Sequence, residues 1–225
     1  MAVDPCTEYS LGLAAYDFVP VILAGVGTVV LAVMTGRQLP ALRRGALVAG
    51  ACVTLGGLAK AVWKLLVAAE PCRNYPFLEN MLFPCLAFGF AGIAWALVGG
   101  RRTTTVPWWP FLGLPILGAA ASIAVWDTWP LLIVSAIGAV VVGVLCTQLA
   151  LDHDDRWGAL LFVVYIVGTL VLPPLAGRPE QSAQVQWMEE ITNSAVQLCF
   201  VLGALRLLAR APRHAGTRRL EGALR

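Results

Sequence analysis

The chain has 225 residues, of which 59% are hydrophobic and 13% are charged, with a formal net charge of +3. Its mean hydropathy of +0.77 excludes an ordinary soluble domain and predicts an integral protein of a bacterial-type plasma membrane. No basic segment precedes the first apolar run. We therefore expect that run to remain as a transmembrane helix instead of being cleaved as a signal peptide.

Seven apolar runs are each long enough to cross about 30 Å of hydrocarbon at about 1.5 Å per residue. None of them alternates with the period of two that a barrel strand requires, so we expect an all-α membrane protein. The connections are short, which predicts a single transmembrane domain over residues 1–225. The runs cover residues 17–36, 46–69, 76–98, 107–125, 130–150, 157–177 and 186–208.

The arginines predict the orientation of these helices. With the N-terminus outside and the C-terminus cytoplasmic, twelve arginines lie in cytoplasmic segments and two lie outside, as the positive-inside rule favours. The basic tail, 211–225, is typical of an anchor on an anionic inner leaflet, so we expect membrane lipids and no nucleic acid as partners. The twelve are Arg37, Arg43, Arg44, Arg101, Arg102, Arg156, Arg206, Arg210, Arg213, Arg218, Arg219 and Arg225; the two are Arg73 and Arg178.

The cysteines and histidines predict one covalent link and no metal centre. Cys6 and Cys72 both fall on the predicted outer side, and our hypothesis is that they form a disulfide. No spacing resembles a zinc site, and both histidines lie in predicted cytoplasmic segments. We expect no metal and no cofactor.

An internal repeat organises the chain. A shift of 110 residues places Tyr16-Asp-Phe-Val-Pro20 on Trp126-Asp-Thr-Trp-Pro130, Gln38 on Gln148, and Glu79 on Glu189. The shift predicts two parallel three-helix repeats, residues 16–100 and 126–210, joined by a linker helix at 107–125. In such an arrangement a binding site is expected near the axis between the halves.

Gln38 and Arg43-Arg44 stand at the inner end of the first predicted helix, and Gln148 takes the matching place in the fifth. Over residues 16–210 the chain resembles, in topology, the PQ-loop and SWEET class of carriers and the broader group that joins them with opsin-like seven-helix proteins. The resemblance implies a transporter with a site between two three-helix bundles.

The chain contains two lysines, Lys60 and Lys64, against fourteen arginines, and both lie in the second predicted helix. A lysine loses its proton readily when it is desolvated, which suits a switchable ion pair, although Lys64 could also extend to the outer headgroups. Lys60, Trp63 and Lys64 share one helix face.

Depth supplies candidate partners for these lysines. Glu79 and Glu189 each lie about 12 Å outward of their helix centres, and Lys64 lies about 10 Å outward, at 1.5 Å per residue. An unpaired charge at that level costs on the order of 3 kcal/mol or more, so we expect a lysine to pair with Glu79 or Glu189. Both glutamates are also candidates for proton coupling.

Further polar residues extend this predicted site. Asn80 follows Glu79, while Asn193 and Gln197 continue the face of Glu189 at i+4 and i+8. Asp17 and Asp127 lie at the outer mouths of the first and fifth helices, where they either line the site or cap a helix. The alternative for the whole set is that these groups only bind one another between helices.

Enzymatic patterns are weaker. No catalytic triad can be assembled from residues within the helices, and we read Asp152-His-Asp-Asp155 as a solvated turn. We therefore predict a carrier of a small polar or zwitterionic solute, with proton coupling and a homo-oligomer both open. A lipid-modifying enzyme or a receptor-like seven-helix sensor is the alternative.

Overall fold

The computed structural model describes residues 6, 9–176 and 182–211, with the side chains of 173–176 outside that description. All secondary structure in these ranges is helical, which confirms the all-α prediction for this part of the chain. Arg178 and residues 212–225 of the basic tail lie outside the described residues.

Nine α-helices and one 3-10 turn make up the described structure. A short helix, α2 (Leu11–Tyr16), leads directly into α3 (Phe18–Gln38), and the turn η1 (Pro40–Leu42) leads into α4 (Arg43–Ala68). The next predicted span is split into α5 (Pro76–Asn80) and α6 (Leu82–Arg102). They are followed by α7 (Trp109–Val125), α8 (Trp129–Asp152), α9 (Arg156–Ala176) and α10 (Ala183–Arg210).

Five helical stretches are long and apolar enough to cross a membrane, which suggests a membrane protein. They are Leu11–Gln38, Pro40–Ala68, Pro76–Arg102, Trp129–Asp152 and Ala183–Arg210. Two others, α7 and the stretch Arg156–Leu172 of α9, are apolar but shorter.

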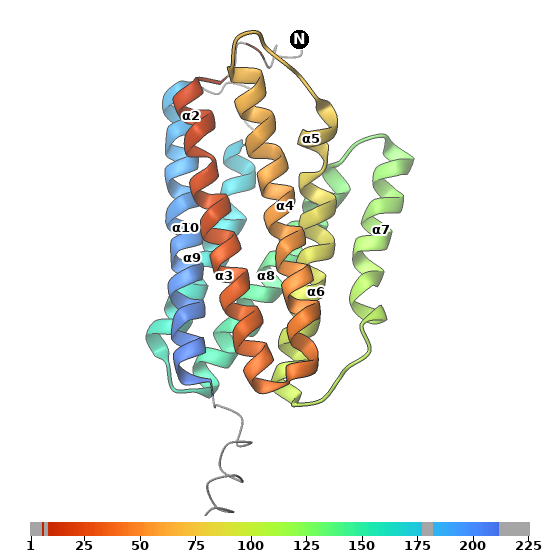
Figure 1. Ribbon diagram of the computed structural model, residues 1–225, viewed down its shortest axis with the longest axis vertical. Helices are drawn as coiled ribbons and strands as arrows, with labels where there is room; N and C mark the ends of the chain where they lie inside the picture. The colour runs from red at the N-terminus through yellow and green to blue at the C-terminus, as the bar shows by residue number, and fades with distance from the viewer. Residues whose placement is uncertain (1–5, 7–8, 177–181, 212–225) are drawn as a thin grey trace, which may run out of the picture.

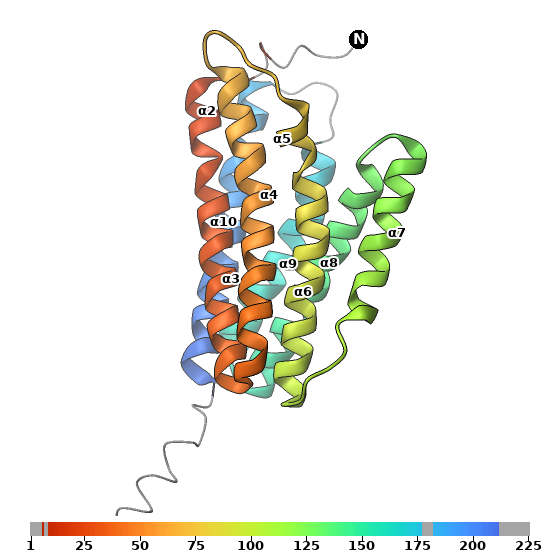
Figure 2. The same ribbon diagram turned by 45° about the vertical axis from the view of Figure 1, so that its right-hand side comes forward.

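Six of the described helices close into a ring. Going round it, α3 packs on α4, α4 on α6, α6 on α8, α8 on α9, α9 on α10, and α10 returns to α3. Helix α7 stands outside the ring against α6 and α8, as both views show (Figure 1, Figure 2). We call the end where α3 begins and α4 ends the upper end, and the opposite end the lower end, as drawn in Figure 1.

Local sequence explains where several helices begin and break. The hydroxyls of Ser10 and Ser182 accept hydrogen bonds from the Leu13 and Val185 amides and so cap α2 and α10. The break between α5 and α6 falls at Met81, and Pro84 lies in the first turn of α6, where a missing amide hydrogen is best tolerated.

Aromatic side chains of α9 and α10 pack together in the core. Tyr165 and Phe162 of α9 are both fully buried, and their rings lie 4.8 and 6.2 Å from the ring of Phe200 on α10. Gly27 of α3 faces Phe200 so closely that an added Cβ would lie 2.5 Å from its ring. These contacts fill the space between the upper and lower ends of α3, α9 and α10.

Candidate functional site

Three buried charged side chains meet at the upper end of the ring. Lys64 Nζ lies 2.6 Å from Glu190 Oε1 and 3.2 Å from Asp17 Oδ1. Lys64, Asp17 and Glu190 expose only 9, 8 and 5% of their surface. We call these residues the upper triad, and it ties α4 to α10 and to the start of α3.

Each member of the upper triad is placed by a different local feature. Asp17 is the single residue between α2 and α3, and its carboxylate makes no capping hydrogen bond there, which leaves it available to Lys64. Lys64 lies in the last turns of α4, and Glu190 in the second turn of α10. A cation between two carboxylates satisfies charges that would each be costly alone.

The N-terminal segment covers the upper triad. The Tyr9 ring lies 5.5 Å from Lys64 Nζ and 6.0 Å, edge to face, from the Trp63 ring. Trp63 Nε1 donates a hydrogen bond to Asn74 Oδ1 at 2.9 Å. Cys6 and Cys72 are joined in a disulfide with a Cα–Cα distance of 5.8 Å. This bond links the N-terminal segment to the loop between α4 and α5, which also contains Asn74. Trp63 therefore anchors this cover and does not line an open cavity.

Lys60, one turn below Lys64, has a different environment. Its Nζ lies 5.9 Å from the centre of the Phe83 ring, a cation–π contact. The positive charge of Lys64 acts on it, as do the negative charges of Asp17, Glu79 and Glu189. Within the described residues neither glutamate forms an ion pair with a lysine, so the pairing of Lys64 with Glu79 or Glu189 was wrong: Asp17 and Glu190 hold it instead.

The inward face of α10 differs from the predicted one by a single residue. Gln186, Glu190 and Ser194 are buried at i, i+4 and i+8, whereas Glu189, Asn193 and Gln197 are half-buried beside them. Consecutive residues on a helix are about 100° apart, so a polar stripe and its neighbour share much of one face. The carboxylate that reaches Lys64 is consequently that of Glu190, which sequence analysis missed.

The remaining predicted residues lie at the surface. Asn80 is exposed at the end of α5. Asp127 is exposed as well, and its Oδ1 accepts a hydrogen bond of 3.2 Å from the Trp129 amide at the start of α8. The two aspartates that the repeat aligns thus differ: Asp17 is a buried ion-pair partner, and Asp127 is an exposed residue that accepts a hydrogen bond from the first amide of α8.

Two buried oxygens on α10 lack hydrogen-bond partners among the described residues. They are Glu190 Oε2 and Ser194 Oγ, which lie one helical turn apart. The second is also buried, since Ser194 is 7% exposed. Most buried polar atoms in proteins have a hydrogen-bond partner, so these two oxygens stand out because they have none among the described residues.

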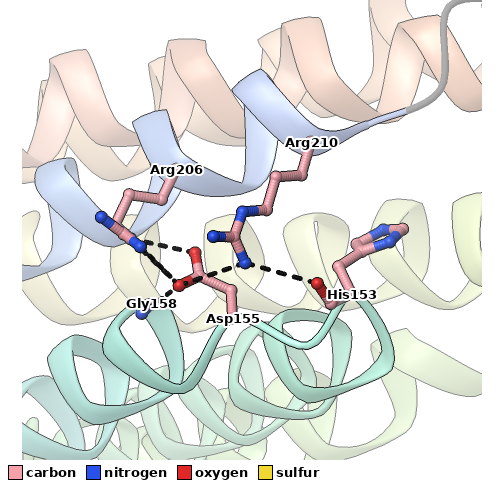
Figure 3. Close-up of polar contacts among 5 residues, drawn as sticks. All are labelled: His153, Asp155, Gly158, Arg206 and Arg210. Atoms are coloured by element: carbon pink, nitrogen blue, oxygen red, sulfur yellow. Dashed lines mark hydrogen bonds and ion pairs between the residues drawn. The ribbon is translucent and has the colours of Figure 1, made fainter.

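A second charged cluster lies at the lower end (Figure 3). Asp155, 1% exposed, receives Arg206 Nη2 at 2.6 Å and Arg206 Nε at 2.9 Å, while Arg210 Nη1 lies 3.3 Å away. The Gly158 amide donates to Asp155 Oδ1 at 3.0 Å. Asp155 thus caps α9 and binds it to the end of α10; its reading as a solvated turn was wrong.

The lower cluster holds Asp155 in its ionised form. Hydrogen bonds from Arg206, above all, lower the pKa of Asp155, and the Gly158 amide and the charges of Arg206 and Arg210 act in the same direction against desolvation. Arg210 Nη1 also donates to the His153 carbonyl at 3.3 Å (Figure 3). The arginines therefore close the loop between α8 and α9 over the end of α10.

Two further contacts join neighbouring helices at the lower end. Arg101 on α6 binds Gln148 Oε1 at 2.6 Å and Asp152 Oδ2 at 3.0 Å, both on α8. Arg37 on α3 donates to the Leu208 carbonyl of α10 at 3.2 Å. The Arg101 contacts join α6 to α8, and the Arg37 contact joins α3 to α10. Both junctions between helices α3–α6 and helices α8–α10 are therefore bridged at the lower end.

The described residues contain no group of three His, Cys, Asp or Glu side chains placed to hold a metal ion. Comparison of the chain with protein-family models, with curated proteins and with solved structures found no match.

Proposed function

We propose that this protein is a proton-coupled membrane carrier of a small polar or zwitterionic solute, built from seven transmembrane helices in two parallel halves. The observation that carries the proposal is the upper triad, because a lysine and two carboxylates are buried between helices that belong to different halves. Charges inside a membrane domain are costly and most often mark a substrate or ion pathway.

The ring order supports the two halves. The first half would be α3, α4 and α6, the second α8, α9 and α10, and α7 the linker outside the ring. The halves meet twice, where α6 packs on α8 and where α10 packs on α3. The 110-residue repeat relates these junctions to each other, as a two-fold axis through the ring would require.

Polar links between the halves at both ends support alternating access. Lys64 and Glu190 join them at the upper end, and Arg101 with Asp152 and Arg37 with the Leu208 carbonyl join them at the lower end. Between these ends the aromatic rings of Phe162, Tyr165 and Phe200 are packed together. We interpret this arrangement as an occluded state in which either set of links breaks to open its own side.

The placement of arginines supports the orientation. Arg37, Arg101 and Arg206 all lie at the lower end, whereas the disulfide between Cys6 and Cys72 lies at the upper end. A cytoplasmic lower end satisfies the positive-inside rule and puts the disulfide in an oxidising compartment.

Solute uptake into proteoliposomes tests the proposal. With an inward proton gradient, wild-type protein should accumulate at least one member of a panel of labelled amino acids, betaines and polyols. Lys64→Met should reduce that uptake at least tenfold, and Asp127→Asn, which alters an exposed residue, serves as the matched control. Absence of flux for every solute, with protein folded in the vesicles, would refute transport.

The close packing between α3, α4 and α6 favours a receptor-like sensor as the second candidate. Thr28, Thr35 and apolar residues of these helices line a crevice with no room for a water molecule, and a sensor needs no continuous pathway. In the uptake experiment a sensor would bind a solute, with a ligand-dependent rise in unfolding temperature, and transport none.

A further inference from the structure

The upper triad carries one positive and two negative charges. Lys64 supplies the single ammonium, while Asp17 and Glu190 supply two carboxylates, so the fully ionised triad has a charge of +1 − 2 = −1. All three residues are buried, with 9% of their surface or less exposed. An unbalanced charge in such a place is strongly unfavourable, and the least costly remedy is a bound cation.

The contacts identify the oxygen that is left over. Glu190 Oε1 takes the short contact with Lys64 Nζ at 2.6 Å. Glu190 Oε2 is buried and has no hydrogen-bond partner among the described residues, and the same is true of Ser194 Oγ one turn further down α10. A proton on Oε2 would remove the excess charge and turn this oxygen into a hydrogen-bond donor.

We propose that Glu190 is the proton-binding residue of this protein, taking up and releasing one proton on Oε2. The protonated triad is neutral, with Lys64 paired to Asp17 and only hydrogen-bonded to Glu190. Because the ion pair between α4 and α10 is thereby weakened, proton binding favours opening of the upper end. This consequence rests on the proposed carrier function, whereas proton binding itself does not.

The neighbouring elements leave Glu190 as the candidate. From the junction of α2 and α3 it faces Asp17, and from α4 it faces Lys64, with the Tyr9 ring above the ammonium. The charges of Lys60 on α4 and Glu189 on α10 also act on triad residues, and Lys60 interacts with Glu79 on α5 as well. With one further cation and two further carboxylates counted, the excess charge remains negative. The charged residues of α8 and α9, which are Asp152 and Arg156, lie at the lower end.

Infrared difference spectroscopy of the purified protein tests the site. Between high and low pH, wild-type protein in lipid nanodiscs should show the C=O stretch of one buried protonated carboxyl group. Glu190→Gln should remove that band. Glu189→Gln and Glu79→Gln are matched controls that should retain the band.

A second variant keeps the charges balanced and leaves Glu190 in place. Asp17→Asn leaves Lys64 facing Glu190 alone, and this pair is neutral without a proton. The variant therefore remains testable if Glu190→Gln unfolds, and it should lack the band at neutral pH. A band that persists without Glu190, or that disappears in Glu189→Gln, overturns the proposal. So does a Na⁺-dependent rise in unfolding temperature that requires Glu190 while no carboxyl band titrates.

The spectroscopic result and the transport result are independent. If the band follows Glu190 while no solute is transported, the proton site stands and the carrier function fails. If solute uptake is driven by the proton gradient but Glu190→Gln leaves both the band and the coupling intact, the carrier function stands and this assignment fails.

Discussion

Lys64 is the side chain on which the upper end depends. It is the single ammonium between two buried carboxylates, at 2.6 Å from Glu190 and 3.2 Å from Asp17. Lys60, only four residues away, makes a cation–π contact and no ion pair with a described residue. The two lysines of the chain are therefore not equivalent, which makes each the control for the other.

Replacing Lys64 by methionine should destabilise the protein by about 3–5 kcal/mol, because Asp17 and Glu190 would then face each other without a cation. Thermal unfolding in detergent, compared with Lys60→Met, measures the effect. Combining Lys64→Met with Glu190→Gln should recover only part of the loss, since Asp17 still lacks its cation. Equal losses for Lys64→Met and Lys60→Met would contradict the ion-pair assignment.

Asp155 makes lower-end stability depend on pH. Since its pKa in the folded protein lies below the ordinary value, its contribution is fully present above pH of about 4 and disappears as pH falls through the lowered pKa. Asp155→Asn should lower stability at neutral pH by about 1.5–3 kcal/mol, the range for hydrogen bonds to charged groups.

Unfolding temperatures measured from neutral to acidic pH check this expectation. The gap between wild-type protein and Asp155→Asn should narrow as pH falls below about 4. Asp154→Asn is the control: Asp154 is exposed and has φ of 54°, a conformation that asparagine adopts readily. A gap that stays constant with pH would show that the ion pair does not contribute.

At the scale of the helices, close packing between α4 and α6 holds the first half of the ring together. Gly89 on α6 lies directly against α4, where an added Cβ would be 2.5 Å from Val53 Cγ2 and 2.9 Å from the Ala49 carbonyl oxygen. Small residues allow this approach of two backbones, and a backbone atom cannot move aside as a side chain can.

Gly89→Ala should therefore destabilise the protein by about 1–3 kcal/mol through overpacking. Gly113→Ala on α7 is the matched substitution, because nothing lies within 4 Å of its Cβ position. It should leave the unfolding temperature unchanged or slightly raised, since alanine favours a helix more than glycine does. A similar response of both variants would argue against tight contact between α4 and α6.

For the whole molecule, the position of α7 decides the topology. The exposed residues Thr104 and Asp127 flank this helix, which has 17 residues and stands outside the ring. If α7 crosses the membrane as the linker of two parallel halves, Thr104 and Asp127 lie on opposite sides of the membrane. If α7 rests on one membrane surface, these two residues lie on the same side and the halves are not parallel.

Labelling with a membrane-impermeant maleimide distinguishes these topologies. In intact cells Asp127→Cys should react, and Thr104→Cys should react only after permeabilisation. Unmodified protein gives the background from Cys52, Cys85, Cys146 and Cys199, which lie within helices. Labelling of both positions from the same side would refute the seven-helix arrangement and with it the two-fold relation between the halves.

The sequence by itself determined the class of protein and the approximate limits of its helices. Apolar runs of sufficient length must be helical in lipid, and prolines and serines mark several starts, so these features depend on local composition alone. Two details could also be predicted from the sequence. Cys6 and Cys72 are the two cysteines on the predicted outer side, and Lys64 is one of only two lysines in the chain.

Only the tertiary structure decided which groups meet. Glu189 and Glu190 are adjacent, and both begin polar stripes on α10, so periodicity could not tell which carboxylate faces inward. That choice follows from the ring, in which α10 packs between α3 and α9 and turns Glu190 and Ser194 to the interior. Likewise, Asp155 is buried because α10 places Arg206, which is 51 residues away in the sequence, against it. A local sequence pattern cannot predict such a contact.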